Sequence, residues 1–152
     1  MSWLVFRIWC KHVLLADYAD KADYADKMTE NEISYKIRGA IFNVYNNLGP
    51  GLLESAYETA LKIELEKEGL LVESQVYLPI VYGDVTIPKA YRIDILVEKK
   101  VIIELKAVQY VNEVFYKQLQ TYLKMTGLKL GILVNFDTTD IASSIHRWVN
   151  GL

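Results

Sequence analysis

Residues 91–107 constrain the fold of this chain more than any other stretch. Two segments rich in apolar and β-branched residues, Tyr91–Val97 and Val101–Ala107, flank a short polar cluster. This pattern predicts two antiparallel β-strands joined by a tight turn. Three charged residues interrupt the strands: Asp94, Glu104 and Lys106. A buried strand accepts charges only when they have partners, so these three side chains need an explanation.

The length of the turn decides which side chains share a face of the sheet. If the turn is Glu98–Lys100, Val97 pairs with Val101. Asp94 is then opposite Glu104, and Arg92 is opposite Lys106. Because side chains alternate between faces, Asp94, Glu104 and Lys106 are expected on one face. The other face is expected to carry the apolar residues Ile93, Ile95, Val101, Ile103 and Leu105.

Two carboxylates that face each other repel, and a bound divalent cation or a proton relieves the repulsion. Mg²⁺ and similar hard cations take oxygen ligands of this kind. The alternative interpretation is an ion-pair cluster on a half-exposed pair of strands.

Composition limits the class of protein. The chain has 152 residues, of which 52% are hydrophobic and 24% charged, as is typical of one soluble globular domain. Its formal net charge of −2 argues against a protein that coats nucleic acid non-specifically. The single cysteine, Cys10, excludes an internal disulfide framework and fits a reducing cytoplasm, which is the expected location.

The first 27 residues differ from the remainder. Met1–Leu15 is apolar and aromatic, but it is too short and too interrupted by charges for a membrane span, and no membrane association is expected. A perfect hexapeptide duplication follows, Ala16–Lys21 and Ala22–Lys27. Two copies do not make a repeat architecture. We predict a flexible extension over residues 1–27 and one domain over residues 28–152.

Two helices are predicted before the hairpin. Thr29 and Glu32 have the spacing of a capping box, and apolar residues then recur at helical spacing as far as Leu48. The following Gly49-Pro-Gly51 ends this helix. A second helix is predicted over Leu52–Lys67.

Strands and helices alternate in the remainder of the chain. We predict a strand over Leu70–Tyr82, a further strand that begins at Val85–Ile87 and is limited to a sheet edge by Pro88, a helix over Asn112–Met125, a strand over Leu128–Phe136 and a short helix over Thr138–Val149. The unit from Val101 to Phe136 is expected to be a parallel strand–helix–strand crossover. The strand Val101–Ala107 is expected at the centre of the sheet, because it is apolar on both sides apart from the candidate site residues.

The start of the second helix carries the most specific pattern in the chain. The segment Leu48-Gly-Pro-Gly-Leu-Leu-Glu-Ser-Ala-Tyr-Glu58 resembles the signature of the GxxExxY family, with Gly51, Glu54 and Tyr57 at the named positions. The arrangement Asp94-x9-Glu104-x-Lys106 resembles the PD-(D/E)XK nuclease superfamily, which includes that family. The resemblance extends from Asn31 to Asn150 and includes Tyr91–Asp94, Val101–Ala107, Gln118–Leu123 and Gly131–Phe136. At Tyr45, similar proteins usually carry a His.

The resemblance implies a fold and a set of site residues. The fold would be α/β, with a restriction-endonuclease-like core in which helices flank a mixed central sheet in the order αβββαβ. Asp94, Glu104 and the backbone carbonyl of Leu105 would bind Mg²⁺ or Mn²⁺, and Lys106 would assist catalysis. Glu54 would be a further metal ligand or would orient the reacting groups. Otherwise Glu54 is a surface glutamate that the helix N-terminus stabilises.

Gln118 and Tyr122 are four residues apart and therefore lie on one face of their predicted helix. This spacing resembles a motif of RecB-like members of the superfamily, and with Arg92 these residues would support the site or the substrate. The alternative is a glutamine at the rim of the helix and a tyrosine in the core.

The implied function is metal-dependent hydrolysis of DNA phosphodiester bonds. A catalytically silent nucleic-acid-binding or protein-binding module on the same fold is the second interpretation, and a homo-oligomer or a protein partner is compatible with either. A structural protein whose charged triad is an ion-pair network is the third.

Overall fold

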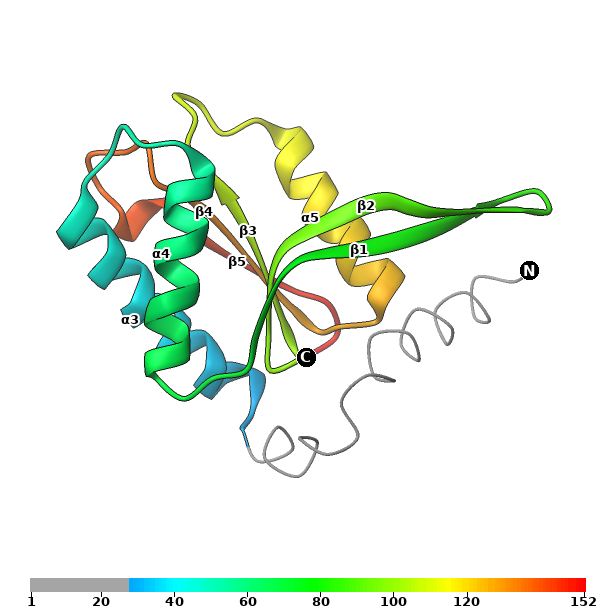
Figure 1. The fold of residues 1–152 in the computed structure, drawn as a ribbon, viewed down its shortest axis with the longest axis horizontal. Helices are drawn as coiled ribbons and strands as arrows, with labels where there is room; N and C mark the ends of the chain where they lie inside the picture. Colours follow the sequence, from blue (N-terminus) through cyan, green and yellow to red (C-terminus); the bar gives the residue numbers. More distant parts are fainter. Residues whose placement is uncertain (1–27) are drawn as a thin grey trace.

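A computed structural model of the chain describes residues 28–152 (Figure 1). The flexible extension and the hexapeptide duplication expected over residues 1–27 lie outside the described residues. The elements are α3 Glu30–Leu48, α4 Glu54–Lys67, β1 Val72–Tyr82, β2 Val85–Val97, β3 Val101–Lys106, α5 Glu113–Thr126, β4 Leu130–Asn135, the 3₁₀ helix η1 Ala142–Ser144 and β5 Ile145–Val149. No helix within residues 28–152 is long and apolar enough to cross a membrane.

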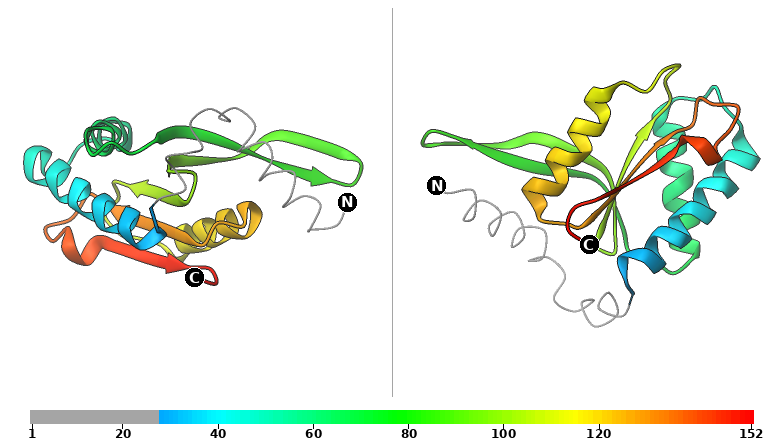
Figure 2. Two further views of the ribbon diagram at one scale, coloured as in Figure 1. Left: turned by 90° about the horizontal axis from the view of Figure 1, so that it is seen from below. Right: turned by 180° about the vertical axis from the view of Figure 1, so that it is seen from behind.

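The sheet is mixed, with strand order β1-β2-β3-β4-β5. The β3–β4 pair is parallel and the other three pairs are antiparallel, so β3 is central as predicted. Helices α3 and α4 lie on one face and α5 lies on the other (Figure 2). The predicted α/β architecture, a mixed sheet flanked by helices, is therefore confirmed.

The first helix begins and ends where the sequence signals predict. The Thr29 side chain accepts from the Glu32 N–H, and the Glu32 carboxylate accepts from the Thr29 N–H, which completes the capping box. Gly49 ends α3 with a φ of 65°, a conformation that favours glycine.

The turn of the central hairpin also has the predicted length. Val97 pairs with Val101, and the Lys100 N–H donates to the Val97 carbonyl. Glu98 adopts the left-handed conformation, with a φ of 51°. Leu71 stabilises this conformation at two points, because its N–H donates to the Glu98 carboxylate and its carbonyl accepts from the Glu98 N–H.

Two apolar cores stabilise the sheet, one under α3 and α4 and the other under α5. The second core depends on a close approach between α5 and β4. A Cβ atom at Gly131 would lie only 2.7 Å from Leu119 Cδ1, so glycine lets the helix sit directly on the strand. This contact fixes the position of α5, and with it Gln118 and Tyr122.

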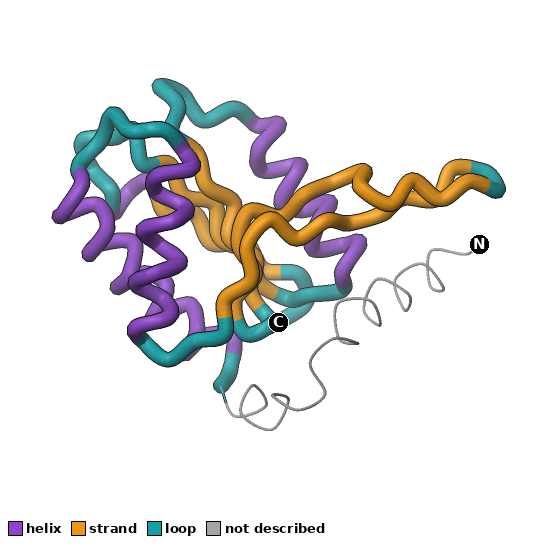
Figure 3. Tube along the Cα trace, in the orientation of Figure 1, coloured by secondary structure: helices purple, strands orange, loops and turns teal. Residues whose placement is uncertain are grey.

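Strands β1 and β2 form a long arm that extends beyond the helices (Figure 3). The expected strand at Val85–Ile87 and the first arm of the hairpin at Tyr91–Val97 are one continuous strand, β2. Its outer part pairs with β1 alone, through contacts such as Ile80 with Ile87, and the register shifts between Leu78 and Ile80. A proline lies at this shift in β1, as expected for a residue without an N–H to donate.

The prediction of a short C-terminal helix over Thr138–Val149 is wrong. The chain forms only η1 there, followed by β5. Strand β5 pairs antiparallel with β4, so that Ile145 lies opposite Val134 and Val149 lies opposite Leu130. Trp148, in β5, is 42% exposed. The helical spacing of apolar residues in this short segment favours a helix only weakly. The edge of β4 offers unpaired N–H and C=O groups, and pairing with a fifth strand satisfies them.

Candidate active site

The candidate site lies where β2 separates from β3. The paired register begins where Val97 pairs with Val101 and ends where Ile95 pairs with Ile103. The expected cross-strand pairs, Asp94 with Glu104 and Arg92 with Lys106, are therefore not part of the ladder. Figure 1 shows β2 leaving the sheet alongside β1 at this point.

At the point of separation, the side chains of β2 also change from one face of the sheet to the other. Ile95 packs in the core under α3 and α4, whereas Ile93 packs in the core under α5. The prediction that Ile93 shares a face with Ile95 is therefore wrong. Gln75 is the residue of β1 that lies beside Asp94 in register, and its φ of 58° marks the local change of direction.

The separation leaves one edge of β3 without a partner strand, and two carboxylates take the place of that strand. The Lys106 carbonyl accepts from the Phe136 N–H on the β4 side, so alternation directs the polar groups of Leu105 and Ala107 towards the opening. The Leu105 N–H donates to Asp94 Oδ2 at 2.9 Å. The Ala107 N–H donates to Glu54 Oε1 at 3.3 Å. The Leu105 carbonyl is directed towards the same opening.

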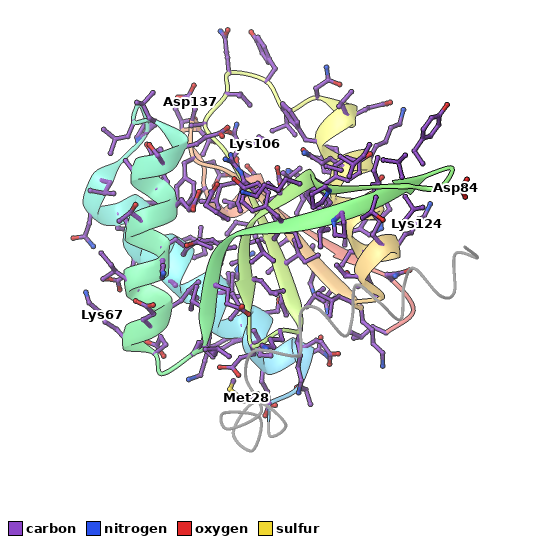
Figure 4. The ribbon with its side chains drawn as sticks, turned by 45° about the vertical axis from the view of Figure 1, so that its right-hand side comes forward. Met28, Lys67, Asp84, Lys106, Lys124 and Asp137 are labelled. Carbon is purple, nitrogen blue, oxygen red and sulfur yellow. The ribbon has the colours of Figure 1, made fainter. Side chains whose placement is uncertain are left out.

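Glu104 and Lys106 flank the opening from the α5 side. Lys106 Nζ lies 2.7 Å from Glu104 Oε1 and 4.9 Å from the centre of the Phe115 ring. Glu104 is 2% exposed, and its other oxygen, Oε2, is buried without a hydrogen-bond partner. Figure 4 shows Lys106 near the end of the sheet that carries Asp137, far from Met28 at the opposite end.

The electrostatics of the two acids follow from this arrangement. Burial, and then the charge of Asp94, raises the pKa of Glu104 from 4.5 to about 7 although Lys106 opposes the shift. Burial also raises the pKa of Asp94, against the Leu105 hydrogen bond and the Lys106 charge. The charge of Asp94 therefore acts on Glu104, and these two acids carry more negative charge than the Lys106 ammonium alone neutralises.

A pocket of about 690 Å³ opens in front of the separated strands. Of the expected site residues, Glu54, Arg92, Asp94 and Leu105 line it. Glu104 and Lys106 are not among its lining residues, because they alternate with Leu105 to the other face of β3.

Gln118 and Tyr122 lie on one face of α5 and bond to each other, as their spacing predicts. Gln118 Nε2 donates to the Tyr122 hydroxyl at 2.8 Å, and that hydroxyl donates to the Arg92 carbonyl at 2.9 Å. Burial, and then the nearby Glu104, raises the pKa of Tyr122 to about 12, so this hydroxyl stays a donor. The pair thereby anchors β2 two residues before Asp94.

Among the pocket residues that sequence reasoning missed are Glu58 and Gln75, and it also missed Asn135, which supports the rim. Glu58 and Gln75 line the pocket and are joined by a 2.6 Å hydrogen bond. Glu58 is one helical turn after Glu54, a signal that helical spacing offered. Asn135 exchanges two hydrogen bonds with the backbone of Val108, which fixes the loop after β3.

The donor set fits a divalent cation in part. Among residues 28–152, no group of three or more His, Cys, Asp or Glu side chains is arranged to hold a metal ion. The available set is two carboxylates, Asp94 and Glu104, and the Leu105 carbonyl. The unpartnered Glu104 Oε2 and the raised pKa values of both acids are what a cation would relieve.

Comparison with family models identifies a family for this chain. Residues 31–148 match the family model of the PD-(D/E)XK nuclease superfamily. A search of curated proteins found no match, and neither did a search of solved structures.

Proposed function

The chain belongs to the PD-(D/E)XK nuclease superfamily, and we propose that it is a metal-dependent nuclease that hydrolyses phosphodiester bonds in DNA. The family match covers the whole sheet except the last residue of β5. It supports a nuclease-type activity, whereas the cation, the substrate and the residue roles are part of the proposal.

One observation carries the proposal. Two acids and one lysine lie close together where β2 separates from β3, and Glu104 Oε2 is buried without a hydrogen-bond partner. A buried carboxylate oxygen without a partner lowers the free energy of unfolding, and a purely structural role does not explain why the protein keeps it. It is explained if the site evolved to bind a cation.

Asp94, Glu104 and the Leu105 carbonyl would hold Mg²⁺ or Mn²⁺. Such a cation supplies Lewis acidity and neutralises the charge of a phosphate group. The Lys106 ammonium lies next to the acids and would stabilise negative charge that develops on the phosphate. Arg92, which lines the pocket, would contact the DNA backbone.

One further acid and two neutral side chains hold the backbone around the site. Glu54 holds the Ala107 amide, and Gln118 and Tyr122 hold the backbone of β2. The positions of Gly51, Glu54 and Tyr57 support the narrower assignment to the GxxExxY family as part of this proposal.

A catalytically silent module on the same fold is the second candidate. It is favoured by the absence, within residues 28–152, of a three-side-chain metal site and by the existing partner of Lys106, which is Glu104. Such a module would bind nucleic acid without cutting it.

Cleavage of single-stranded and double-stranded DNA with Mg²⁺ or Mn²⁺ tests the proposal. We expect cation-dependent cleavage by the wild type and a loss on the order of 100-fold in Lys106→Ala. Lys100→Ala is the matched control, because Lys100 Nζ donates to the Met28 carbonyl at the other end of the domain. Binding without cleavage would support the silent module, and cleavage that survives Lys106→Ala unchanged would contradict the proposed site.

A further inference from the structure

We infer that Tyr57 is a positioning residue, which holds the loop before α4 closed and so keeps Glu54 against the end of β3. The inference concerns the geometry of the site, and its effect on cleavage rests on the proposed function. Tyr57 is fully buried and lies one turn into α4, away from the pocket lining.

The Tyr57 hydroxyl joins the two ends of the α3–α4 loop. It donates to the Gly49 carbonyl at 2.6 Å and accepts from the Leu52 N–H at 3.1 Å. Gly49 is the residue after α3, and Leu53 is the N-cap of α4 without any side-chain capping bond. The hydroxyl therefore fixes a loop whose last residue has no polar side chain to fix it locally.

The Tyr57 ring connects the same loop to β3. It stacks on Phe136, with ring centres 4.4 Å apart and planes 7° from parallel. The Phe136 N–H donates to the Lys106 carbonyl at 2.8 Å. The start of α4 is thus set against the end of β3 through one stacked pair and one backbone hydrogen bond.

The position of the start of α4 matters because the hydrogen bond between Glu54 and the Ala107 N–H is long. Glu54 Oε1 lies 3.3 Å from the Ala107 N–H, near the upper limit for an N–H···O hydrogen bond. A small shift of the helix start would break it. The Asp94 bond to the neighbouring amide of Leu105, at 2.9 Å, does not depend on α4.

Amide hydrogen exchange in Tyr57→Phe tests the inference without any assay of cleavage. The variant keeps the stacked ring and removes only the hydroxyl. We expect exchange at Leu52 and Ala107 to rise roughly tenfold, the loss of about one hydrogen bond, while exchange at Leu105 is unchanged. Faster exchange at Leu52 with an unchanged Ala107 would overturn the inference.

Tyr45→Phe is the matched control. It also removes a tyrosine hydroxyl that bonds a loop carbonyl, that of Thr138 at 2.5 Å. We expect no effect on Ala107 exchange, and an equal rise in both variants would mean general destabilisation, which overturns the inference. Should Tyr57→Phe not fold, wild-type exchange in dilute denaturant decides. Leu52 and Ala107 must then open with the same free energy and denaturant slope, and different values overturn the inference.

If the wild type cleaves DNA, a double-mutant cycle with Glu54→Gln extends the test. Tyr57→Phe should lower kcat roughly tenfold with KM unchanged, and it should cause little further loss in the Glu54→Gln background. Full additivity would overturn the positioning role. A wild type that does not cleave DNA counts against the proposed function alone, because the exchange result still decides the role of Tyr57.

Discussion

Lys106 contacts only one of the two oxygens of the Glu104 carboxylate. Its ammonium lies 2.7 Å from Glu104 Oε1, while Oε2 of the same carboxylate is buried without a hydrogen-bond partner. Because Asp94 adds a second negative charge nearby, the ion pair leaves an excess of negative charge inside the protein. That excess makes the folded state sensitive to pH and to cations.

In the absence of a cation, the free energy of unfolding should fall as the pH rises from about 4.5 to about 7. The Glu104 pKa is 4.5 when the chain is unfolded and about 7 when it is folded, so the folded state binds more protons in this window. The loss from Glu104 is on the order of 3 kcal/mol and is complete above the folded pKa. Urea unfolding at several pH values measures it. Glu104→Gln should lack this loss, and parallel curves for the two proteins would contradict the prediction.

Asp94→Asn should abolish stabilisation by Mg²⁺ without unfolding the protein. The amide oxygen of asparagine can still accept from the Leu105 N–H, but one ligand charge is lost. For the wild type we expect Mg²⁺ to raise the midpoint of thermal unfolding at pH 8 and much less at pH 5, where protons compete for the carboxylates. Equal stabilisation of the wild type and Asp94→Asn would place the cation elsewhere.

Tyr122→Phe should lower the free energy of unfolding by about 1 kcal/mol, because it leaves the Arg92 carbonyl and the Gln118 amide without a buried partner. Denaturant unfolding measures the change. Tyr116→Phe serves as the control on the same helix, since Tyr116 contacts His146 through its ring. A larger cost for the control would show that the α5 bond to β2 is unimportant.

Gly131→Ala should destabilise the protein by about 1–3 kcal/mol, because the new methyl group meets Leu119 in a packed core. Leu119→Ala removes the obstructing atoms, and in that background Gly131→Ala should cost almost nothing. The four free energies of unfolding form a double-mutant cycle. Additive changes in the free energy of unfolding would mean that the contact between α5 and β4 does not limit the size of the side chain at position 131.

Several features of the fold and site followed from neighbouring residues alone. The capping box at Thr29, the end of α3 at Gly49 and the three-residue turn before Val101 each depend on backbone preferences and side chains within a few positions. The central place of β3 followed from its apolar residues on both faces, which only Glu104 and Lys106 interrupt. The close association of Gln118 and Tyr122 followed from helical spacing.

Other features could not be predicted from local sequence. The separation of β2 from β3 at Ile95, the exchange of faces beside Gln75, and the pairing of Ile145–Val149 with β4 all depend on which distant segment offers unpaired backbone groups.

The sequence by itself determined where most helices and strands begin and end, and it determined that two acids and a lysine occur on neighbouring strands. The tertiary structure alone decided that Asp94 and Glu54 take the place of a missing strand along β3. The physical reason is that every backbone N–H at a buried edge needs an acceptor, and only the packed chain shows which one is within reach.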